Sequence, residues 1–183
     1  LSCVSVASDV YKRVGSCCSV GGNLNTARYL LGGAGTQTAA LGFGGEPPNA
    51  GVTSTEEYGG ASWTSGGNLN QARREVAGLG ISTAALAVSG ATGPPLHNLV
   101  ESWNGSSWTE IADVNTAVAN HGAAGTSTAG IKFGGNGPNS QVELWNGTSW
   151  TETTEINTAR TGTGNAGPVN TDVLLFGGNN DPG

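Results

Sequence analysis

The side chains that most often perform chemistry are few in this sequence, and their spacing forms no catalytic pattern. The two histidines are His97, in the segment GPPLHN, and His121, in an expected strand. Hydroxyl groups are abundant, but no Gly-x-Ser-x-Gly segment or local Ser/His/Asp arrangement prepares one of them as a nucleophile. Most acidic residues recur with a repeat, which favours structural roles over a glycosidase-like carboxylate pair. The sequence therefore predicts no catalytic residue and no enzymatic activity.

Metal-binding patterns are equally weak. Cys3, Cys17 and Cys18 include no Cys-x-x-Cys pair, and no Cys/His cluster has the spacing of a zinc site. Their odd number leaves two alternatives open, three small buried residues or one disulfide from Cys3 to one of the vicinal pair. The segments GGNGPNS (134–140) and GGNNDPG (177–183) contain oxygen donors that suit calcium, but they lack EF-hand spacing. We expect ordinary turns there, no metal and no cofactor.

The composition argues against several kinds of partner. Charged residues make up 11% of the 183 residues, and seven Lys and Arg against thirteen Asp and Glu give a net charge of −6. We therefore expect no nucleic-acid partner and no attraction to anionic membranes. No apolar run approaches the ~20 residues that a membrane-spanning helix needs, so we expect no membrane insertion. The length suits one domain, and the start at Leu1 without any Met leads us to expect a processed product or a piece of a longer chain.

A repeat of about 45 residues organises the chain. The segment GGNLNTAR (21–28) returns as GGNLNQAR (66–73), IADVNTAV (111–118) and TTEINTAR (153–160), so that successive final positions are 45, 45 and 42 residues apart. Three other markers keep the same spacing. They are the pairs Gly44-Gly45, Ser89-Gly90, Gly134-Gly135 and Gly177-Gly178; the acids Glu56, Glu101 and Glu143; and the rings Trp63, Trp108 and Trp150.

Each repeat has the pattern of four short strands. Runs such as VAGLGIS, TAALAVSG, LVESW and SWTEI are separated by Gly, Pro and Asn clusters about every ten residues, and no segment keeps a helical apolar stripe. Four strands in about 45 residues is the size of one propeller blade. The first strand of each unit is rich in Gly and Ala, which predicts a crowded position nearest the axis. Acidic and basic repeat markers are expected to form a partly buried ladder: Glu56, Glu101 and Glu143 with Arg28, Arg73 and Arg160.

Two near-copies of one cassette, WNGSSWTE (103–110) and WNGTSWTE (145–152), predict aromatic hairpins. If Asn-Gly forms a two-residue turn, the two Trp residues lie two positions out of register. If the loop instead has four residues, the two Trp residues lie directly opposite each other. Either loop puts both rings on one side of the sheet, where they can pack against a neighbouring blade. The Asn-Gly-Ser and Asn-Gly-Thr sequons are explained by the turn alone.

The spacing of these markers resembles the kelch repeat, the blade unit of kelch and galactose-oxidase-like β-propellers. The residues that carry the resemblance are Gly44, Gly45, Glu56, Tyr58, Trp63, Arg73, Gly90, Glu101, Trp103, Trp108, Gly134, Gly135, Glu143, Trp145, Trp150 and Arg160. The departures are Ser89 for Gly, Val118 for Arg and Cys18 for Trp. The resemblance covers about residues 21 to 178 and implies an all-β propeller of four-stranded blades.

The repeat divides the chain into three complete blades and a partial fourth. The expected boundaries are 28–72, 73–117, 118–159 and 160–183, within one propeller domain or propeller fragment over 1–183. Residues 1–27 can supply the missing strands of the fourth blade and close a ring of four. An open fragment of a larger ring and assembly with further copies remain alternatives, because unpaired edge strands invite pairing with another chain.

Loops that differ between the repeats are the expected binding site. The loops between the second and third strands vary most, in EPPNAGVT (46–53), ATGPPLHN (91–98) and NGPNSQ (136–141), whereas the scaffold is constant. The candidate ligand-binding residues are Glu46, Asn49, Pro95, His97, Asn98, Asn136 and Asn139. The alternative is that these loops vary because nothing constrains them.

These observations predict a non-enzymatic binding or structural module. The Gly/Ser/Thr/Asn-rich, Lys-poor repeats also resemble kelch-type arrays of phage virion proteins and bacterial surface proteins, which implies a tail-fibre, virion or adhesin module. Its expected partners are a host-surface glycan or protein subunits of a larger assembly, in a virion or outside the cell. The alternatives are an intracellular kelch-type interaction module and a copper oxidase. The copper oxidase would have to draw its ligands from Tyr11, Tyr29, Tyr58, His97, His121 and Cys17, which no spacing links.

Overall fold

The computed structural model describes residues 11–14, 17–47, 50–137 and 139–180. This part of the chain consists of strands, turns and loops, so it contains no helix that could cross a membrane. Its strands form five antiparallel sheets, in which strands adjacent in sequence are neighbours. The predicted all-β class with four-stranded sheets is confirmed.

Three sheets have four strands each, in sequence order from one edge to the other. The first sheet consists of β3 (Gly32–Gly35), β4 (Ala40–Phe43), β5 (Thr55–Tyr58) and β6 (Trp63–Ser65). The second sheet consists of β7 (Ala77–Ile81), β8 (Ala84–Ala91), β9 (Leu96–Trp103) and β10 (Trp108–Glu110). The third sheet consists of β11 (Gly122–Thr126), β12 (Ala129–Phe133), β13 (Val142–Trp145) and β14 (Trp150–Thr153).

Two-stranded sheets precede and follow these three. The N-terminal sheet is the hairpin of β1 (Tyr11–Val14) and β2 (Cys17–Val20). The C-terminal sheet is the hairpin of β15 (Gly164–Val169) and β16 (Asp172–Phe176). Because the repeat marker Gly177-Gly178 follows β16 as Gly44-Gly45 follows β4, β15 and β16 are the first two strands of a fourth repeat.

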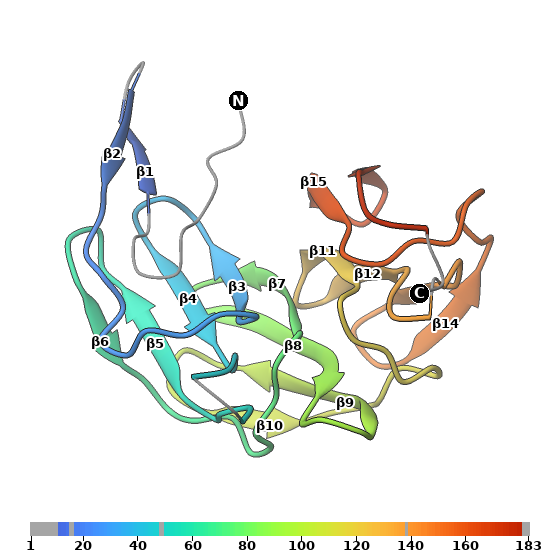
Figure 1. Cartoon of the computed structure of the whole chain (residues 1–183), viewed down its shortest axis with the longest axis horizontal. Helices are drawn as coiled ribbons and strands as arrows, with labels where there is room; N and C mark the ends of the chain where they lie inside the picture. The colour runs from blue at the N-terminus through green and yellow to red at the C-terminus, as the bar shows by residue number, and fades with distance from the viewer. Residues whose placement is uncertain (1–10, 15–16, 48–49, 138, 181–183) are drawn as a thin grey trace.

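The sheets stand side by side along an open arc (Figure 1), with their first strands innermost. Strand β3 lies beside β7, β7 beside β11, and β11 beside β15. Small residues permit this approach, since a Cβ on Gly78 would lie 2.3 Å from the carbonyl oxygen of Gly33 in the neighbouring sheet. The predicted Gly- and Ala-rich inner strands are therefore confirmed, and they line an open groove of about 240 Å³.

Aromatic rings from each sheet pack against the sheet before it. The Trp108 ring lies 4.8 Å from that of Phe43 in an edge-to-face arrangement, and its Nε1 donates a 2.9 Å hydrogen bond to Thr55 Oγ1. The third sheet repeats this packing with Trp145 and Trp150 against the second. Large buried indoles of this kind dominate the packing energy of small sheets.

The two tryptophans of each cassette face each other directly across a four-residue loop. Trp103 pairs with Trp108 at a ring separation of 5.2 Å, and the corresponding pair in the third sheet is 5.3 Å apart. Asn104 holds the loop, because its Oδ1 accepts 3.0 Å hydrogen bonds from the backbone N–H groups of Ser106 and Ser107. Of the two loops that the sequence allowed, the four-residue loop is the one that forms.

Buried ion pairs connect the third strand of a sheet with the segment that enters it. Arg28 lies 3.0 Å from Glu56, and Arg73 lies 2.8 Å from Glu101. Burial lowers the pKa of the Arg73 guanidinium, and the charge of Glu101 opposes this shift. Glu101 also accepts a 2.7 Å hydrogen bond from the backbone N–H of Asn70, so one carboxylate fixes both the arginine and the entering loop.

Arg28 and Arg73 join the predicted ladder of acidic and basic repeat markers, but Arg160 does not. Glu143 instead pairs with Lys132 of β12 at 2.7 Å, and Arg160 donates a 2.8 Å hydrogen bond to the carbonyl oxygen of Gly177. In the first two sheets, the arginine precedes the glutamate of its own sheet. The third sheet has Val118 at that arginine position, whereas Arg160 begins the fourth repeat, which has no third strand in the described residues.

Candidate functional site

One short backbone element recurs where the chain enters each sheet. The residue that follows the repeat arginine forms an isolated antiparallel bridge with the residue that follows the Gly-Gly marker: Tyr29 with Glu46, and Arg74 with Ala91. Thr161 and Asn179 form the corresponding bridge in the fourth repeat. In the third repeat, the N–H of Asn136 donates a 2.9 Å hydrogen bond to the carbonyl oxygen of Ala119.

The next residue of each repeat links neighbouring sheets. The N–H of Glu75 donates to the carbonyl oxygen of Leu30 at 2.8 Å, that of Asn120 to Glu75 at 3.2 Å, and that of Gly162 to Asn120 at 2.7 Å. All four residues have left-handed backbone geometry, with φ values of 56°, 55°, 51° and 64° in chain order. The four repeats therefore share one backbone frame around the inner edge of the arc.

The side chains on this frame differ between the repeats, except that the third and fourth repeats share Asn at positions 136 and 179. We call its side-chain positions the rim positions: Tyr29, Leu30 and Glu46; Arg74, Glu75 and Ala91; Ala119, Asn120 and Asn136; and Thr161, Gly162 and Asn179. A constant backbone with variable side chains is the arrangement in which surface recognition can change without loss of the fold.

Polar rim side chains from all four repeats form one network. We call Glu46, Arg74, Glu75, Asn120, Asn136 and Thr161 the rim cluster. Arg74 forms an ion pair with Glu46 and lies 3.7 Å from Glu75. Glu75 Oε2 accepts hydrogen bonds from Asn120 at 2.8 Å and from Asn136 at 3.3 Å.

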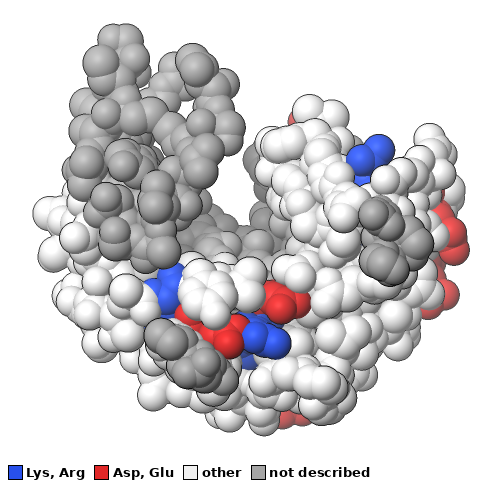
Figure 2. Space-filling model, viewed as in Figure 1, with Lys and Arg blue, Asp and Glu red and all other residues white. Residues whose placement is uncertain are grey.

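The network continues into the fourth repeat, where Thr161 Oγ1 donates a 3.2 Å hydrogen bond to Asn136 Oδ1. Figure 2 shows acidic and basic side chains gathered near the middle of the face in view. The hydrogen bond from Arg74 to Glu46 raises the pKa of this guanidinium, so the cation is retained at every physiological pH.

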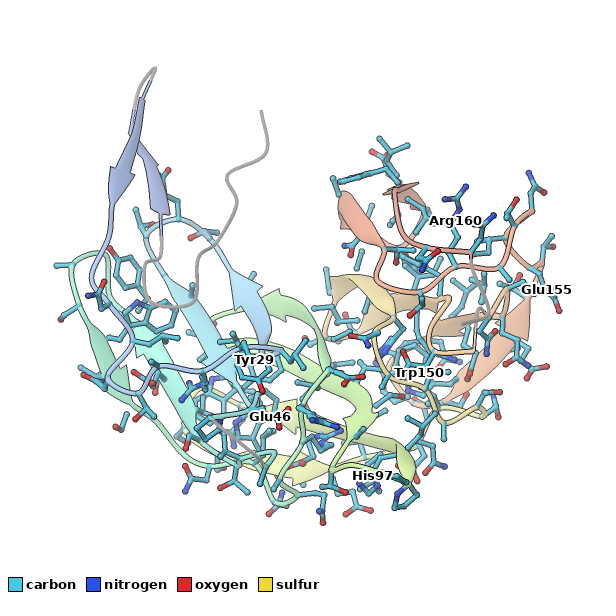
Figure 3. All side chains as sticks on the ribbon, viewed as in Figure 1. Tyr29, Glu46, His97, Trp150, Glu155 and Arg160 are labelled. Carbon is cyan, nitrogen blue, oxygen red and sulfur yellow. The ribbon has the colours of Figure 1, made fainter. Side chains whose placement is uncertain are left out.

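Two exposed apolar side chains border the rim cluster. Tyr29 is 46% exposed and Leu30 is 38% exposed. Tyr29 projects beside Glu46 near the inner edge of the arc (Figure 3). An exposed aromatic ring next to amides, carboxylates and a guanidinium can bind a ligand with one flat apolar side and several hydroxyl groups.

Side chains at the left-handed positions have a conformational cost. A left-handed non-glycine residue costs on the order of 1–3 kcal/mol, and Leu30 and Glu75 lack the local side-chain hydrogen bonds that help Asn adopt this geometry. The fourth repeat has Gly162 there, so the fold does not require a side chain at this position. The retained side chains of Leu30 and Glu75 therefore favour a role beyond folding.

The rim presents charged and hydrogen-bonding groups beside an exposed aromatic ring. Both carboxylates of the rim cluster are held by Arg74 or by side-chain amides. Across the described ranges, no three His, Cys, Asp or Glu side chains approach closely enough to hold a metal ion.

The structure brings only some of the predicted binding residues together. Glu46 and Asn136 come together through Arg74 and Glu75, as members of the rim cluster. Asn139 lies nearby in the β12–β13 loop, where its Oδ1 accepts a 2.7 Å hydrogen bond from the N–H of Gln141. Asn49 lies outside the described residues.

The remaining three predicted residues belong to the hairpin between β8 and β9. Pro95 is exposed, and Asn98 accepts a hydrogen bond on its backbone oxygen from the N–H of Val114. His97 Nε2 lies 3.0 Å from Thr92 Oγ1, and desolvation and then the charge of Arg73 lower its pKa. His97 lies away from the inner edge of the arc, far from Tyr29 (Figure 3), so these residues do not join the rim cluster.

Sequence reasoning missed most of the rim. Tyr29, Arg74, Glu75, Asn120 and Thr161 directly follow the repeat marker that ends in Ala-Arg, in the segments RYL, RRE, VAN and RTG. The signal that could have found these residues is sequence variation directly beside a constant marker. The loops between the second and third strands show the same kind of variation.

No protein-family model matches the chain, and no curated protein is similar to it in sequence. The class that the fold and the rim define is therefore an all-β protein of repeated four-stranded antiparallel sheets with one variable polar face.

Proposed function

We propose that this chain is a partial β-propeller of kelch-like blades and acts as a non-enzymatic binding module. The observation that carries the proposal is the rim, where one backbone frame recurs four times with different side chains. The Glu56, Glu101 and Glu143 anchors and the paired aromatic hairpins supply a rigid scaffold, on which a binding surface is pre-organised.

The ligand class that suits the rim best is a glycan. Sugars combine an apolar ring face, which stacks on an aromatic side chain, with hydroxyl groups that pair with amides and carboxylates. Tyr29 offers the aromatic face, and Asn120, Asn136 and Glu46 offer polar groups already oriented by the network. We propose a host-surface glycan and a virion or extracellular location, which the Lys-poor, Gly- and Asn-rich composition supports.

A glycan array tests this proposal. The intact chain should bind a subset of glycans, and Tyr29→Ala should lower the affinity at least about tenfold, which corresponds to the loss of one stacking contact of roughly 1.4 kcal/mol. Leu30→Gly should also weaken binding while raising the melting temperature, because it removes a side chain and relieves the left-handed backbone.

Ile81→Ala is the matched control. Ile81 is 54% exposed at the opposite end of its inner strand, so its truncation should leave the affinity unchanged. Absence of any glycan signal, or full affinity in both Tyr29→Ala and Leu30→Gly, would contradict a glycan site at the rim.

A structural role in an assembly is the second candidate function. It is favoured by the apolar side chains that β16 exposes, because surfaces of this kind on a monomer mark contacts with other chains.

A further inference from the structure

The two-stranded sheets at the ends of the arc are complementary halves of one four-stranded sheet. β15 and β16 are the first and second strands of a repeat. The β1–β2 hairpin has the register of the third and fourth strands: it pairs Tyr11 with Val20 and Arg13 with Cys18, as β5–β6 pairs Glu56 with Ser65 and Tyr58 with Trp63. Each end therefore has the two strands that the other lacks.

The unpaired half-sheet at the C-terminal end exposes core-type side chains. Leu174 is 66% exposed and Phe176 is 52% exposed. At the equivalent positions of the first sheet, Leu41 is 2% exposed and Phe43 is 0% exposed. There, β5 pairs with β4, and Trp108 of the following sheet covers the phenyl ring. The same two kinds of contact, a third strand and a following sheet, would cover β16.

We propose that the β1–β2 hairpin of a second copy of this chain pairs with β16 and completes the fourth sheet. This proposal rests on the equivalence of the repeats that also underlies the proposed function. The register of β4 with β5 pairs Leu41 with Glu57 and Ala40 with Tyr58. Transferred to the composite sheet, it places Leu174 opposite Lys12 and Val173 opposite Arg13 of the partner copy.

The arc itself favours a second copy over closure within one chain. The β1–β2 hairpin and β15–β16 lie on opposite sides of the opening (Figure 1). Neighbouring sheets are held by the repeated backbone hydrogen bonds between residues 30, 75, 120 and 162 and by buried indoles. Closure within one chain would have to bring the two ends together across this opening, whereas pairing with a second copy does not require that movement.

Reciprocal pairing gives a closed assembly. The hairpin of each copy can complete the half-sheet of the other, so two copies form a symmetric ring without a remaining edge. In this ring, Phe176 comes to lie beside the first sheet of the partner copy, as Phe43 lies beside the second sheet within one chain.

Mixed cysteine cross-linking tests the pairing. In a chain with Cys3, Cys17 and Cys18 replaced by Ser, one preparation carries Lys12→Cys and a second carries Leu174→Cys. After mixing and oxidation, we expect a disulfide-linked dimer that contains one chain of each kind, and no such dimer from either preparation alone. Directly opposed residues on paired antiparallel strands have Cα atoms about 4.5–5.5 Å apart, within the Cα separations that a disulfide spans.

A register control uses Val173→Cys in place of Leu174→Cys. A shift of one residue turns the thiol to the opposite face of the sheet, so cross-linking to Lys12→Cys should fall at least about tenfold. Equal cross-linking of both, or none of either, would overturn the proposed pairing. A chain with both Lys12→Cys and Leu174→Cys that forms its disulfide as a monomer would show closure within one chain and would also overturn it.

The particle mass gives an independent readout. The unmodified chain should have the mass of two copies by light scattering, and Leu174→Lys with Phe176→Lys should reduce it to one copy with an unchanged β-type circular dichroism spectrum. A single-copy mass for the unmodified chain at all concentrations contradicts the proposal. Leu30→Gly should still cross-link, so a failed glycan site and a failed pairing are distinguishable.

Discussion

Lys132 lies directly opposite Glu143 on the neighbouring strand, with its Nζ 2.7 Å from the glutamate Oε1, and both side chains are fully buried. At the position of Lys132, the first two sheets have Gly42 and Ala87. In those sheets the cation comes from an arginine at the entry of the sheet, where the third sheet has Val118. The third sheet therefore supplies the same charge from a different strand.

Exchange of the two cation positions tests this equivalence. Lys132→Ala should lower the free energy of unfolding by about 3–5 kcal/mol, because it leaves Glu143 buried without its cation. Val118→Arg should also destabilise, since it adds a second cation to the same site. The double variant Lys132→Ala/Val118→Arg has the charge arrangement of the second sheet. Its loss of unfolding free energy should be at least about 2 kcal/mol smaller than the sum of the losses in the two single variants.

Denaturant unfolding measures these values, and Arg160→Ala is the control. Arg160 contacts only a backbone carbonyl in the described ion-pair and hydrogen-bond network, so its truncation should cost about 1 kcal/mol or less. Additive effects of Lys132→Ala and Val118→Arg would show that the two positions do not serve one carboxylate.

The indole hydrogen bonds between sheets provide a second test. Trp108 Nε1 donates to Thr55 Oγ1. The buried Nε1 of Trp150 has no partner within the described part of the chain, and Val100 occupies the position equivalent to Thr55. Thr55→Val should lower the free energy of unfolding by about 1–3 kcal/mol. Val100→Thr should raise it by up to about 1 kcal/mol. Both changes are measured by thermal or denaturant unfolding. If Thr55→Val and Val100→Thr change the free energy of unfolding equally and in the same direction, the indole hydrogen bond does not stabilise the contact between the sheets.

The departure from Gly-Gly in the second repeat is expected to cost stability. Ser89 has a φ of 52°, and the equivalent Gly44, Gly134 and Gly177 have φ values of 63°, 68° and 69°. Ser89→Gly should therefore raise the free energy of unfolding by about 1 kcal/mol. The reverse change, Gly134→Ser, should destabilise, because its Cβ would lie 2.7 Å from the carbonyl oxygen of Arg160. Destabilisation by Ser89→Gly would contradict the prediction.

His121 makes stability depend on pH. Burial, followed by the charges of Lys132 and Arg73, lowers its pKa from 6.5 to about 3, and neither ring nitrogen has a hydrogen-bond partner among the residues that the structure describes. Between these pH values the unfolded chain binds a proton that the folded chain does not, so stability falls as the pH drops from 6.5 toward 3. The slope from this one group is about 1.4 kcal/mol per pH unit.

His121→Val, which introduces the residue of the equivalent position Val76, should remove that slope. The measurement is the difference in unfolding free energy between the variant and the unmodified chain at several pH values, which cancels the carboxylates common to both. His97→Gln is the control at a partly exposed histidine. A difference that stays constant from pH 6.5 to pH 4 would show that His121 is not held neutral.

The repeat allowed much of the fold to be predicted. Four markers of constant spacing defined strand number, order and the inner position of the Gly- and Ala-rich strands, because each marker has one place in a sheet. Which residues pair with each other was harder to predict from the sequence. The choice between two hairpin loops depended on Asn104, whose side chain holds a four-residue turn, and the partner of Glu143 depended on a substitution on another strand.

The site was predicted only in part for a related reason. Glu46 and Asn136 were found because they begin variable loops, but the loops themselves diverge in space. Arg74, Glu75 and Asn120 follow the constant marker, and nothing in their types signals that left-handed geometry brings four repeats together. Such contacts between repeats are set by the curvature of the arc, which no single repeat encodes.

Hydrogen exchange at the backbone amides of Glu75, Asn120 and Gly162 tests the central claim most directly. These amides join consecutive sheets at the inner edge, although they lie in loops beside partly exposed side chains. We predict that all three exchange at least about 100-fold more slowly than the amides of Thr83 and Thr128 in exposed hairpin turns. Exchange of all three at the rate of these turns would contradict the shared frame.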